Sequence, residues 1–339
     1  MNKIRNLVIT GGSGFIGTNL IEIALKKNLR VLNIDRLNYC SNSRKFNHRN
    51  YLFKKLDLTN GKKLNIVLKK FKPDAIINCA AESHVDRSIN NPGIFVHSNI
   101  FSILNILNFV KNYSKKIKLI HVSTDEVFGS LKNNKNKFDL KSKYDPKSPY
   151  SASKASSDFF VRSFGNTYNI DYVITNCSNN YGPYQYTEKL IPVVILSCIK
   201  KKKIPIYGKG RNIREWIFVK DHCEALIKIL YKKRTKDTYL IGSNNEFSNV
   251  KIINFICEWF NENIDKTYNY KALKKFVVDR KGHDFRYALD YSQTSKDLNW
   301  FPRSNFKETL ILTIKFYLEN FSKLKNIFPY EKKNSYPWK

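Results

Sequence analysis

Short apolar runs alternate with longer amphipathic segments along the first half of the chain. The short runs have the length of buried strands, and the longer segments have helical length and periodicity. The predicted strands are residues 7–10, 31–34, 75–79, 119–123 and 172–176. The predicted helices are residues 15–27, 95–113 and 151–168. Strands that alternate with helices favour an α/β fold with a doubly wound parallel sheet.

The alternation weakens after about residue 180, where loops such as YGPYQYTEK and GKGRNIREW surround shorter predicted helices at 190–200 and 250–263. We therefore predict two parts. Residues 1–180 form a dinucleotide-binding domain that carries the catalytic residues, and residues 181–339 form mainly a smaller C-terminal substrate-binding lobe, with some segments returning to the first domain. In doubly wound proteins ligands bind outside the carboxyl ends of the strands, so the lobe is expected to close over a second ligand there.

Composition narrows the class of protein. The chain has 339 residues, is 42% hydrophobic and lacks the roughly 18 consecutive apolar residues that span a bilayer. Its basic, apolar start is interrupted at once by glycines, as in a first strand rather than a secretory signal. The six cysteines lie far apart without CxxC spacing, which predicts free buried thiols and no metal site. We expect a soluble, cytoplasmic protein.

The formal net charge of +32 is the most unusual global property. Such a charge could attract nucleic acid or a phosphorylated ligand. Lysine and asparagine are, however, spread over the whole chain in pieces such as LKNNKNK, and no nucleic-acid recognition motif accompanies them. The pattern favours a solvated basic surface, while a nucleic-acid-binding protein on this fold remains the alternative from a different class.

A glycine-rich loop joins the first predicted strand to the first predicted helix, which is the context of a Rossmann-type cofactor loop. Gly11, Gly14 and Gly17 follow a GxxGxxG spacing. Glycines permit a tight turn and close approach to a pyrophosphate, whose charge is favoured by a helix N-terminus. Asp35, at the end of the second strand, can accept hydrogen bonds from ribose hydroxyls and would repel a 2′-phosphate. NAD is therefore favoured over NADP, although the neighbouring Arg36 leaves NADP as an alternative cofactor.

Tyr150 and Lys154 form a second motif at the start of a predicted helix. A spacing of four residues places both side chains on one helical face. A nearby ammonium favours the ionised form of a phenol, so Tyr150 is expected to take a proton from a substrate hydroxyl. Lys154 can also bind the nicotinamide ribose. YxxxK occurs by chance, but its place after the fourth strand favours a function.

Further segments carry a resemblance to a known family. These are AAESHVDRSI (80–89), STDEVFG (123–129), SPYSASKASSD, NNYGPYQYTEKLIP, IREWIFVKDH and DRKGHDFRYALD. Together with the glycine loop and YxxxK they cover nearly the whole chain. The sequence resembles the dTDP-glucose 4,6-dehydratase family, which belongs to the extended short-chain dehydrogenases that act on nucleotide sugars.

The resemblance implies oxidation of the sugar at C4, elimination of water across C5 and C6, and return of hydride to C6. It implies tightly bound NAD that is regenerated in each turnover, a homodimer, and a deoxysugar pathway such as that of rhamnose. Glu126 would be the base at C5, and protonated Asp125 would be the acid at the C6 hydroxyl. Consecutive strand residues face opposite ways, so both can serve one site only if the strand has ended there.

The same resemblance extends the set of expected site residues. The catalytic residues are Thr124, Asp125, Glu126, Tyr150 and Lys154. The cofactor-binding residues are Gly11, Gly14, Phe15, Ile16, Gly17, Asp35, Arg36, Leu37, Asn38, Asp57, Leu58, Ala80, Ala81, Ser83, Tyr150, Lys154 and Asn180. The substrate-binding residues are His84, Thr124, Asn179, Lys189, Leu190, Pro205, Tyr207, Arg214, Asn249, Asp279, Arg280 and His283.

Because of two departures from the family's pattern, the sequence does not decide which base the nucleotide carries. Lys281 stands where DRxGH has proline, and Leu240 replaces an asparagine; we expect both in the nucleotide-binding half. A UDP-glucose 4,6-dehydratase, or another epimerase or dehydratase of the superfamily, is the alternative function.

Overall fold

The computed structural model describes residues 4–132, 136–233 and 235–330. Seven strands form one sheet in the order β10-β6-β5-β4-β1-β2-β3, and every neighbouring pair is parallel. The strands are β1 (Asn6–Thr10), β2 (Arg30–Asp35), β3 (Tyr51–Lys55), β4 (Ala75–Asn78), β5 (Lys118–Thr124), β6 (Tyr172–Cys177) and β10 (Asp237–Ile241). The predicted doubly wound α/β fold is confirmed. The strand order reverses between β1 and β4, which is where such sheets bind their ligands.

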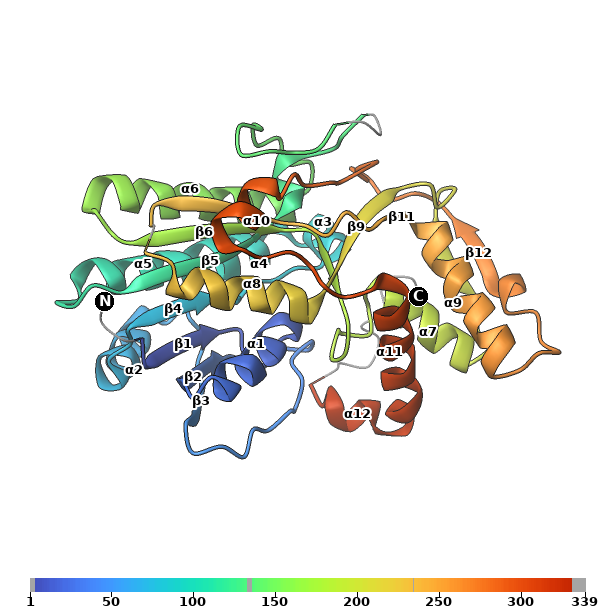
Figure 1. Ribbon diagram of the computed structural model, residues 1–339, viewed down its shortest axis with the longest axis horizontal. Coiled ribbons are helices and arrows are strands. Elements are labelled where there is room, and N and C mark those ends of the chain that lie inside the picture. Colours follow the sequence, from blue (N-terminus) through green and yellow to red (C-terminus); the bar gives the residue numbers. More distant parts are fainter. Residues whose placement is uncertain (1–3, 133–135, 234, 331–339) are drawn as a thin grey trace.

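Helices cover both faces of this sheet (Figure 1). In β1, Leu7 and Ile9 enter one apolar core and Val8 enters the other, because successive side chains of a strand face opposite sides. The first core is closed by α1 (Phe15–Lys26), α8 (Val219–Tyr231) and α10 (Ser292–Leu298). The second is closed by α2 (Gly61–Phe71), α5 (Ser102–Asn112) and α6 (Pro149–Tyr168). Burial on both faces explains why the strands read as continuous apolar runs.

One helical stretch in the described residues, Pro92–Asn112, is long and apolar enough to cross a membrane by length and composition. It follows α3 (Val85–Asn90) and comprises α4 (Pro92–Phe95), a π-helical segment η1 (Val96–Phe101) and α5. Half of its most apolar window is buried inside the protein. Ile103 and Ile106 are fully buried against the sheet. The stretch therefore packs as a helix of the core.

The chain after β6 builds a second lobe with its own apolar core. Its strands are β7 (Asn179–Tyr181), β9 (Ile213–Phe218) and β11 (Glu246–Ser248) in one sheet, and β8 (Ile204–Tyr207) and β12 (Lys274–Val277) in another. Its helices are α7 (Leu190–Ile199), α9 (Asn249–Asn263), α11 (Phe306–Glu319), α12 (Leu324–Ile327) and the 3-10 turns η3 (Tyr270–Leu273) and η4 (Phe321–Lys323). Ile195, Ile253 and Ile314 are fully buried among these elements.

Two local expectations need correction. Leu240 lies in β10, paired with Asn176 of β6, and is buried in the large sheet rather than in the nucleotide-binding half. The segment around LKNNKNK, expected to belong to a solvated surface, is partly fixed after residue 136: Phe138 is buried, stacks on Phe128 and forms a β-bridge to Leu289. Residues 133–135 of that segment lie outside the described residues.

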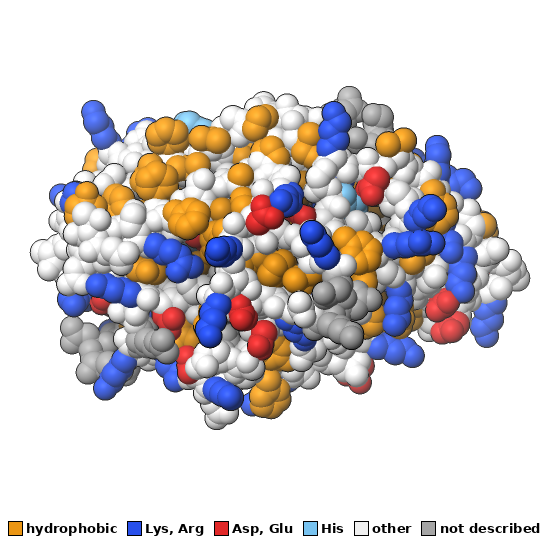
Figure 2. All heavy atoms as spheres, turned by 90° about the horizontal axis from the view of Figure 1, so that it is seen from above, with side chains coloured by type: hydrophobic (Ala, Val, Ile, Leu, Met, Phe, Trp, Pro, Cys, Tyr) orange, Lys and Arg blue, Asp and Glu red, His pale blue; other side chains and the backbone are white. Residues whose placement is uncertain are grey.

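Lys and Arg side chains are scattered over the face seen in Figure 2, with hydrophobic side chains between them. On that face the positive charge is not gathered into one patch. This distribution matches the dispersed lysines of the sequence.

Candidate active site

The glycine loop turns sharply between β1 and α1. Gly11 has a φ of +68°, and a Cβ there would lie 2.7 Å from the backbone of Ala80. A Cβ on Gly14 would meet only the Gly11 carbonyl, at 3.2 Å, so this side of the loop is open. Gly14 caps α1, whose first turn carries no acidic residue. The loop thus offers backbone N–H groups and a favourable dipole to a pyrophosphate.

Asp35 is held rigidly at the end of β2. Its carboxylate accepts hydrogen bonds from the backbone N–H groups of Ser13 (3.0 Å) and Leu37 (2.7 Å) and from the Ser41 hydroxyl (3.2 Å). Burial raises the pKa of Asp35, although these hydrogen bonds oppose the rise. The fixed carboxylate lies where a ribose diol would be recognised.

Arg36 is occupied by carboxylates of the protein. Its guanidinium contacts Glu82, and lies 3.4 Å from Asp57 and 3.1 Å from the Ser98 hydroxyl. A 2′-phosphate would have to displace these partners and approach Asp35. The arrangement therefore fits NAD better than NADP.

The cofactor end of the cleft gathers most of the predicted cofactor residues. One pocket is lined by Gly11, Gly14, Asp35, Arg36, Asn38, Asp57, Leu58, Ala80 and Ala81, among others. Phe15, Ile16 and Gly17 line the adjoining pocket. Leu37 lies instead on a shallow neighbouring hollow with Lys54 and Lys55.

Strand β5 ends at Thr124, and the next four residues form a 3-10 turn, η2 (Asp125–Phe128). The Thr124 hydroxyl accepts a hydrogen bond from the Glu126 N–H and donates one to Asp125, each 3.2 Å long. Because the strand has ended, its alternation of faces no longer separates the two acids. Both line one cavity with Thr124.

The two acids differ in their surroundings. The pKa of Asp125 is raised well above its usual range by complete burial and by the charge of Glu126. Burial also raises the pKa of Glu126, but Arg280, Arg214 and Lys189 oppose that rise. These surroundings favour protonation of Asp125 over protonation of Glu126.

Tyr150 and Lys154 lie on the buried face of α6 and line the same cavity as the two acids. Ser148 caps the helix in a capping box with Ser151, and Pro149 takes the first position. The pKa of Tyr150 is raised well above its usual value by burial and by the Glu126 charge, contrary to the lowering expected from an ammonium. The pKa of Lys154 is lowered by burial. Burial is the largest cause of both shifts.

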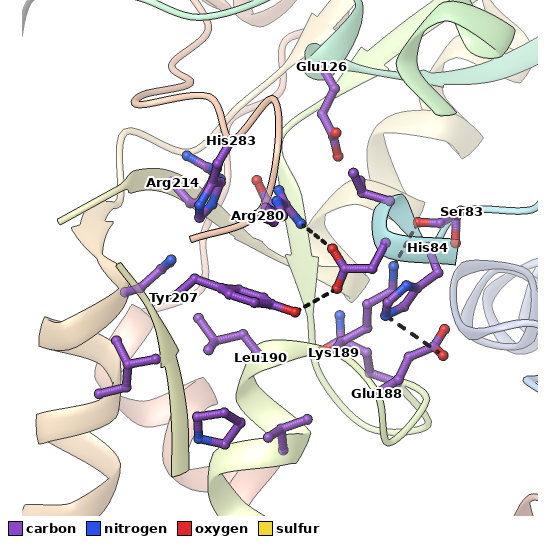
Figure 3. A pocket seen from close by; sticks show the side chains of 18 of the residues that line it. Ser83, His84, Glu126, Glu188, Lys189, Leu190, Tyr207, Arg214, Arg280 and His283 are labelled. Atoms are coloured by element: carbon purple, nitrogen blue, oxygen red, sulfur yellow. Dashed lines mark hydrogen bonds and ion pairs between the residues drawn. The ribbon is translucent and has the colours of Figure 1, made fainter. Parts of the chain in front are cut away.

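A second pocket lies between the two lobes and adjoins the catalytic cavity (Figure 3). Glu126 projects into it from one side, Arg214, Arg280 and His283 lie on another, and Ser83, His84 and Lys189 lie opposite (Figure 3). Of the predicted substrate residues, the pocket is lined by His84, Asn179, Lys189, Leu190, Pro205, Tyr207, Arg214, Asn249, Arg280 and His283. Ser83 and Asn180 line it as well as the catalytic cavity. Three basic side chains here could neutralise a diphosphate.

Several of these residues are held by one another. Asp86 accepts a hydrogen bond from the Tyr207 hydroxyl (3.1 Å) and lies 3.6 Å from the Arg280 guanidinium. The Lys189 ammonium donates to the Ser83 carbonyl at 2.8 Å. Asp279 does not line the pocket; its carboxylate lies 2.5 Å from the His283 ring. Burial lowers the pKa of His283 to about 4, so the ring is neutral near pH 7.

Sequence reasoning missed two residues beside the site. Glu188 lines both pockets, and it accepts hydrogen bonds from Tyr39 (3.0 Å) and Arg87 (3.2 Å). Tyr287 is buried beneath Arg214, whose guanidinium lies 4.4 Å from the ring centroid. Glu188 precedes Lys189 and Tyr287 ends the DRKGHDFRY stretch, so both stand in quoted motifs. The sequence spacing of Glu188 and Tyr287 does not distinguish them from nearby residues that have only a structural role.

All six cysteines are free thiols. Cys177, Cys198, Cys223 and Cys257 are buried free thiols, whereas Cys40 and Cys79 are half-buried and line the cofactor cleft. The expectation that all six are buried is thus wrong for two. Within the described residues there is no group of three or more His, Cys, Asp or Glu side chains that could hold a metal.

Comparisons with known proteins agree on one family. The family model described as GDP-mannose 4,6 dehydratase matches residues 8–313. The dTDP-glucose 4,6-dehydratase of Haemophilus influenzae is 42% identical over 94% of this chain and 99% of its own length. That of Xanthomonas campestris pv. campestris (strain B100) is 41% identical over 92% of this chain and 93% of its own.

Solved structures agree with the sequence relatives. The dTDP-glucose 4,6-dehydratase of Bacillus anthracis, in complex with NAD, has a TM-score of 0.84 and 37% identity over 94% of this chain and 98% of its own. That of Streptomyces venezuelae, also with NAD bound, has a TM-score of 0.87 and 34% identity over the same shares. The UDP-glucose 4-epimerase of Thermotoga maritima has a TM-score of 0.83 at 23% identity over 93% of this chain and 99% of its own, a likeness of fold alone.

Proposed function

This chain belongs to the family of nucleotide-sugar 4,6-dehydratases that includes the dTDP-glucose 4,6-dehydratases, and we propose that it converts dTDP-glucose into dTDP-4-keto-6-deoxyglucose. The cofactor is NAD. The observation that carries the proposal is the gathering of Asp125, Glu126, Tyr150 and Lys154 in one cavity beside the glycine loop. Oxidation of the sugar without dehydration would need only Tyr150 and Lys154.

The first half of the reaction removes a proton and a hydride from the sugar. NAD supplies a hydride acceptor that is regenerated within each turnover. Tyr150 takes the proton of the C4 hydroxyl, and the ammonium of Lys154 favours the phenolate that does so. The resulting C4 ketone acidifies the hydrogen on C5, so the next proton transfer needs only a carboxylate.

The second half eliminates water. Glu126 removes the C5 proton, and Asp125 donates its proton to the C6 hydroxyl as the C–O bond breaks. Bound NADH would supply the hydride to C6, and Glu126 would return its proton to C5. Asp125 would then regain a proton and Tyr150 would lose the one it took, by exchange with solvent. This division of labour follows from the raised pKa of Asp125 and from the three cations that face Glu126.

The pocket between the lobes is proposed to hold the nucleotide. Lys189, Arg214 and Arg280 would contact the diphosphate, and Tyr207 and Asn249 would lie against the nucleoside. Ser83 and Asn179 line both the pocket and the catalytic cavity and, with the adjacent His84, would contact the sugar. Asp279 would act through His283 rather than on the nucleotide.

The direct test is turnover with two nucleotide sugars. Incubation with dTDP-glucose is expected to yield the alkaline absorbance of a 4-keto sugar, at a higher kcat/KM than with UDP-glucose. A higher value for UDP-glucose would make the chain a UDP-glucose 4,6-dehydratase. Isomerisation at C4 without loss of water would make it an epimerase and would refute the proposal.

Further properties belong to this proposal. We expect a cytoplasmic enzyme that supplies a deoxysugar pathway such as that of rhamnose. We also expect residues 1–180 to carry the cofactor and catalysis, and residues 181–339 to bind mainly the nucleotide sugar. A nucleic-acid role is not favoured, because the charge is dispersed on the face in Figure 2.

The proposed homodimer has a candidate surface. Ile94, Val96, Phe101, Phe159 and Phe160 are large exposed hydrophobic side chains with exposed fractions between 37% and 56%. They come from α4, η1 and α6, which pack against one another. Exposed apolar patches of this kind are typical of subunit contacts.

A further inference from the structure

A buried carboxylate joins the two lobes beside the cofactor cleft, and the proposed mechanism does not use it. Glu188 lies between β7 and α7 of the second lobe and is 5% exposed. Its Oε1 accepts a hydrogen bond from the Tyr39 hydroxyl (3.0 Å), and its Oε2 accepts one from the Arg87 Nε (3.2 Å). Tyr39 lies in the loop between β2 and β3, and Arg87 lies in α3. One side chain of the second lobe is thus bound by two segments that flank the large sheet.

The three side chains form one packed unit, which we call the Tyr39–Glu188–Arg87 junction. The Arg87 guanidinium lies 4.0 Å from the centroid of the Tyr39 ring, a cation–π contact. The Tyr39 ring also packs edge-on against Tyr186, with centroids 5.3 Å apart. Burial raises the pKa of Tyr39, so the hydroxyl keeps the proton that it donates. Burial also raises the pKa of Glu188, and the charges of Lys189 and Arg87 oppose that rise.

The neighbouring His84 ring agrees with these donor and acceptor roles. Its Nδ1 accepts a hydrogen bond from the backbone N–H of Arg87 (3.4 Å), so the proton of the neutral ring is on Nε2. The Nε2 lies 3.8 Å from the Glu188 Oε2 (Figure 3). Burial lowers the pKa of His84 to about 2, so the ring adds no charge near pH 7. Tyr39, Arg87 and His84 therefore all present donors to the carboxylate.

The junction adjoins the place where the middle of the cofactor would lie. The adenosine end and the catalytic cavity share Gly11, Gly14 and Cys40 among their lining residues. A dinucleotide that fills both cavities must therefore run its pyrophosphate between the glycine loop and the segment that carries Cys40. Tyr39 immediately precedes Cys40, and Glu188 lines the catalytic cavity. The bond between them crosses from one side of the cleft to the other.

The same segment has further contacts on both sides. We call residues 38–44 the strap. Its Asn42 N–H donates to the Ser13 carbonyl in the glycine loop at 2.8 Å. Its Ser43 N–H donates to the Ile327 carbonyl of α12 at 2.8 Å, and Figure 1 shows this loop running beside α12. The strap therefore reaches from the glycine loop to the second lobe.

We infer that the Tyr39–Glu188–Arg87 junction holds the strap closed over the pyrophosphate of NAD and thereby slows exchange of the cofactor. The three are positioning residues, which act on the strap and not on the reacting atoms. The inference rests on the proposed function, in which NAD is regenerated within each turnover and has no need to leave. All contacts of the junction join protein groups, so a closed strap obstructs entry of NAD as well as its release. Weakening the junction should therefore speed both and change the affinity little.

The test measures NAD exchange in Tyr39→Phe, which removes the hydroxyl but keeps the ring beneath Arg87. The full chain is loaded with radiolabelled NAD and chased with excess unlabelled NAD to obtain the release rate. Rapid mixing of the cofactor-free chain with NAD gives the association rate from intrinsic fluorescence. Because a hydrogen bond to a charged acceptor is lost, both rates should rise about tenfold, while the dissociation constant changes by less than about threefold.

The matched control is Tyr291→Phe, because Tyr291 lines neither cavity and its hydroxyl accepts a hydrogen bond from the Asn244 side chain at 3.0 Å. NAD exchange should keep the parent rates in this control. The inference is overturned if Tyr39→Phe leaves the release rate unchanged, or if the control speeds release equally. It is also overturned if release alone becomes faster, since Tyr39 would then stabilise bound NAD rather than close the strap.

A second variant tests whether the pair acts as a unit. Glu188→Gln keeps the size of the side chain but removes its charge, so the Tyr39 hydroxyl then meets a neutral and weaker acceptor. In this background Tyr39→Phe should speed release less than it does in the parent. A full tenfold effect in that background would overturn the inference. Should Glu188→Gln fail to fold, Tyr39→Phe and its control decide the matter. No sugar is present, so failure of dTDP-glucose turnover would be a separate result.

Discussion

Asp125 and Glu126 are adjacent in the chain, yet Asp125 is 1% exposed and enclosed while Glu126 opens into the pocket between the lobes. The 3-10 turn that follows β5 produces this difference. The enclosed acid holds its proton, and its neighbour faces Arg214, Arg280 and Lys189. This difference supports the opposite roles that we propose for the two carboxyl groups, and each role can be tested separately.

Glu126→Gln should stop the reaction after the first oxidation. The amide cannot remove the C5 proton, so no 4-keto-6-deoxy product forms, and NADH absorbance should appear and persist. We expect the overall rate to fall by about 10²–10⁴-fold. Rapid-mixing absorbance with dTDP-glucose measures both quantities. Product formation at the parent rate would remove Glu126 from the proposed role.

Asp125→Asn should stop the reaction one step later. Glu126 can still exchange the C5 proton, but no acid protonates the C6 hydroxyl, so loss of water should slow by about 10²–10⁴-fold. In deuterated solvent the recovered sugar should carry deuterium at C5 and retain its C6 oxygen, as measured by mass spectrometry and NMR. Absence of C5 exchange would mean that Asp125 acts before deprotonation.

Arg280→Gln should change the pH dependence of kcat. The charge of Arg280 lowers the pKa of Glu126, so its removal should raise that pKa further and protonate the base at a higher pH. The acidic limb of the kcat profile should move to higher pH, while the alkaline limb, set by Asp125, stays nearly fixed. Turnover across pH values checks this. Movement of the acidic limb to lower pH would contradict the assigned base.

Asp35→Asn should relax the choice of cofactor. The parent enzyme should bind NAD more tightly than NADP, since the Asp35 carboxylate would repel a 2′-phosphate and Arg36 is held by Glu82 and Asp57. Removing the carboxylate charge should improve the NADP to NAD affinity ratio by about tenfold. Fluorescence titration of the cofactor-free chain measures it. An unchanged ratio would show that Asp35 does not set specificity.

Phe159→Glu should separate the proposed homodimer. A carboxylate at this exposed apolar position of α6 would be buried without a partner in the proposed dimer. Analytical ultracentrifugation should show a dimer for the parent and a monomer for the variant. Ile264→Glu is the matched control, because Ile264 is 50% exposed at the end of α9 in the other lobe. A monomeric parent would refute the proposed assembly.

The strands of the large sheet were predictable wherever both of their faces are covered. β1, β4 and β5 consist almost entirely of buried residues, so they stand out as apolar runs. The edge strand β3 contains four exposed residues, and its sequence YLFKK carries no such signal. β10 was missed because its residues lie between segments of the second lobe in the sequence and join the sheet only through pairing with β6.

The resemblance to the dehydratase family is confirmed by the comparisons, whereas the assigned site residues remain predictions. Motifs led to Asp125, Glu126, Tyr150 and Lys154, because their residue types suit the chemistry. The junction that holds the strap could not be found this way. Its members lie up to 149 positions apart in the sequence, and only packing brings them together.

The position of β10 in the sequence affects how the polypeptide folds while it is being synthesised. The sheet that begins with β1 is completed by residues 237–241, after the strands and helices of the second lobe have begun. While the chain is being synthesised, β6 is an open edge, and the face later covered by α8 is an uncovered apolar surface until those residues emerge. A fragment that ends at residue 180 would retain both exposed features. We expect this fragment to aggregate. In the full chain, we expect the two lobes to unfold as one cooperative unit.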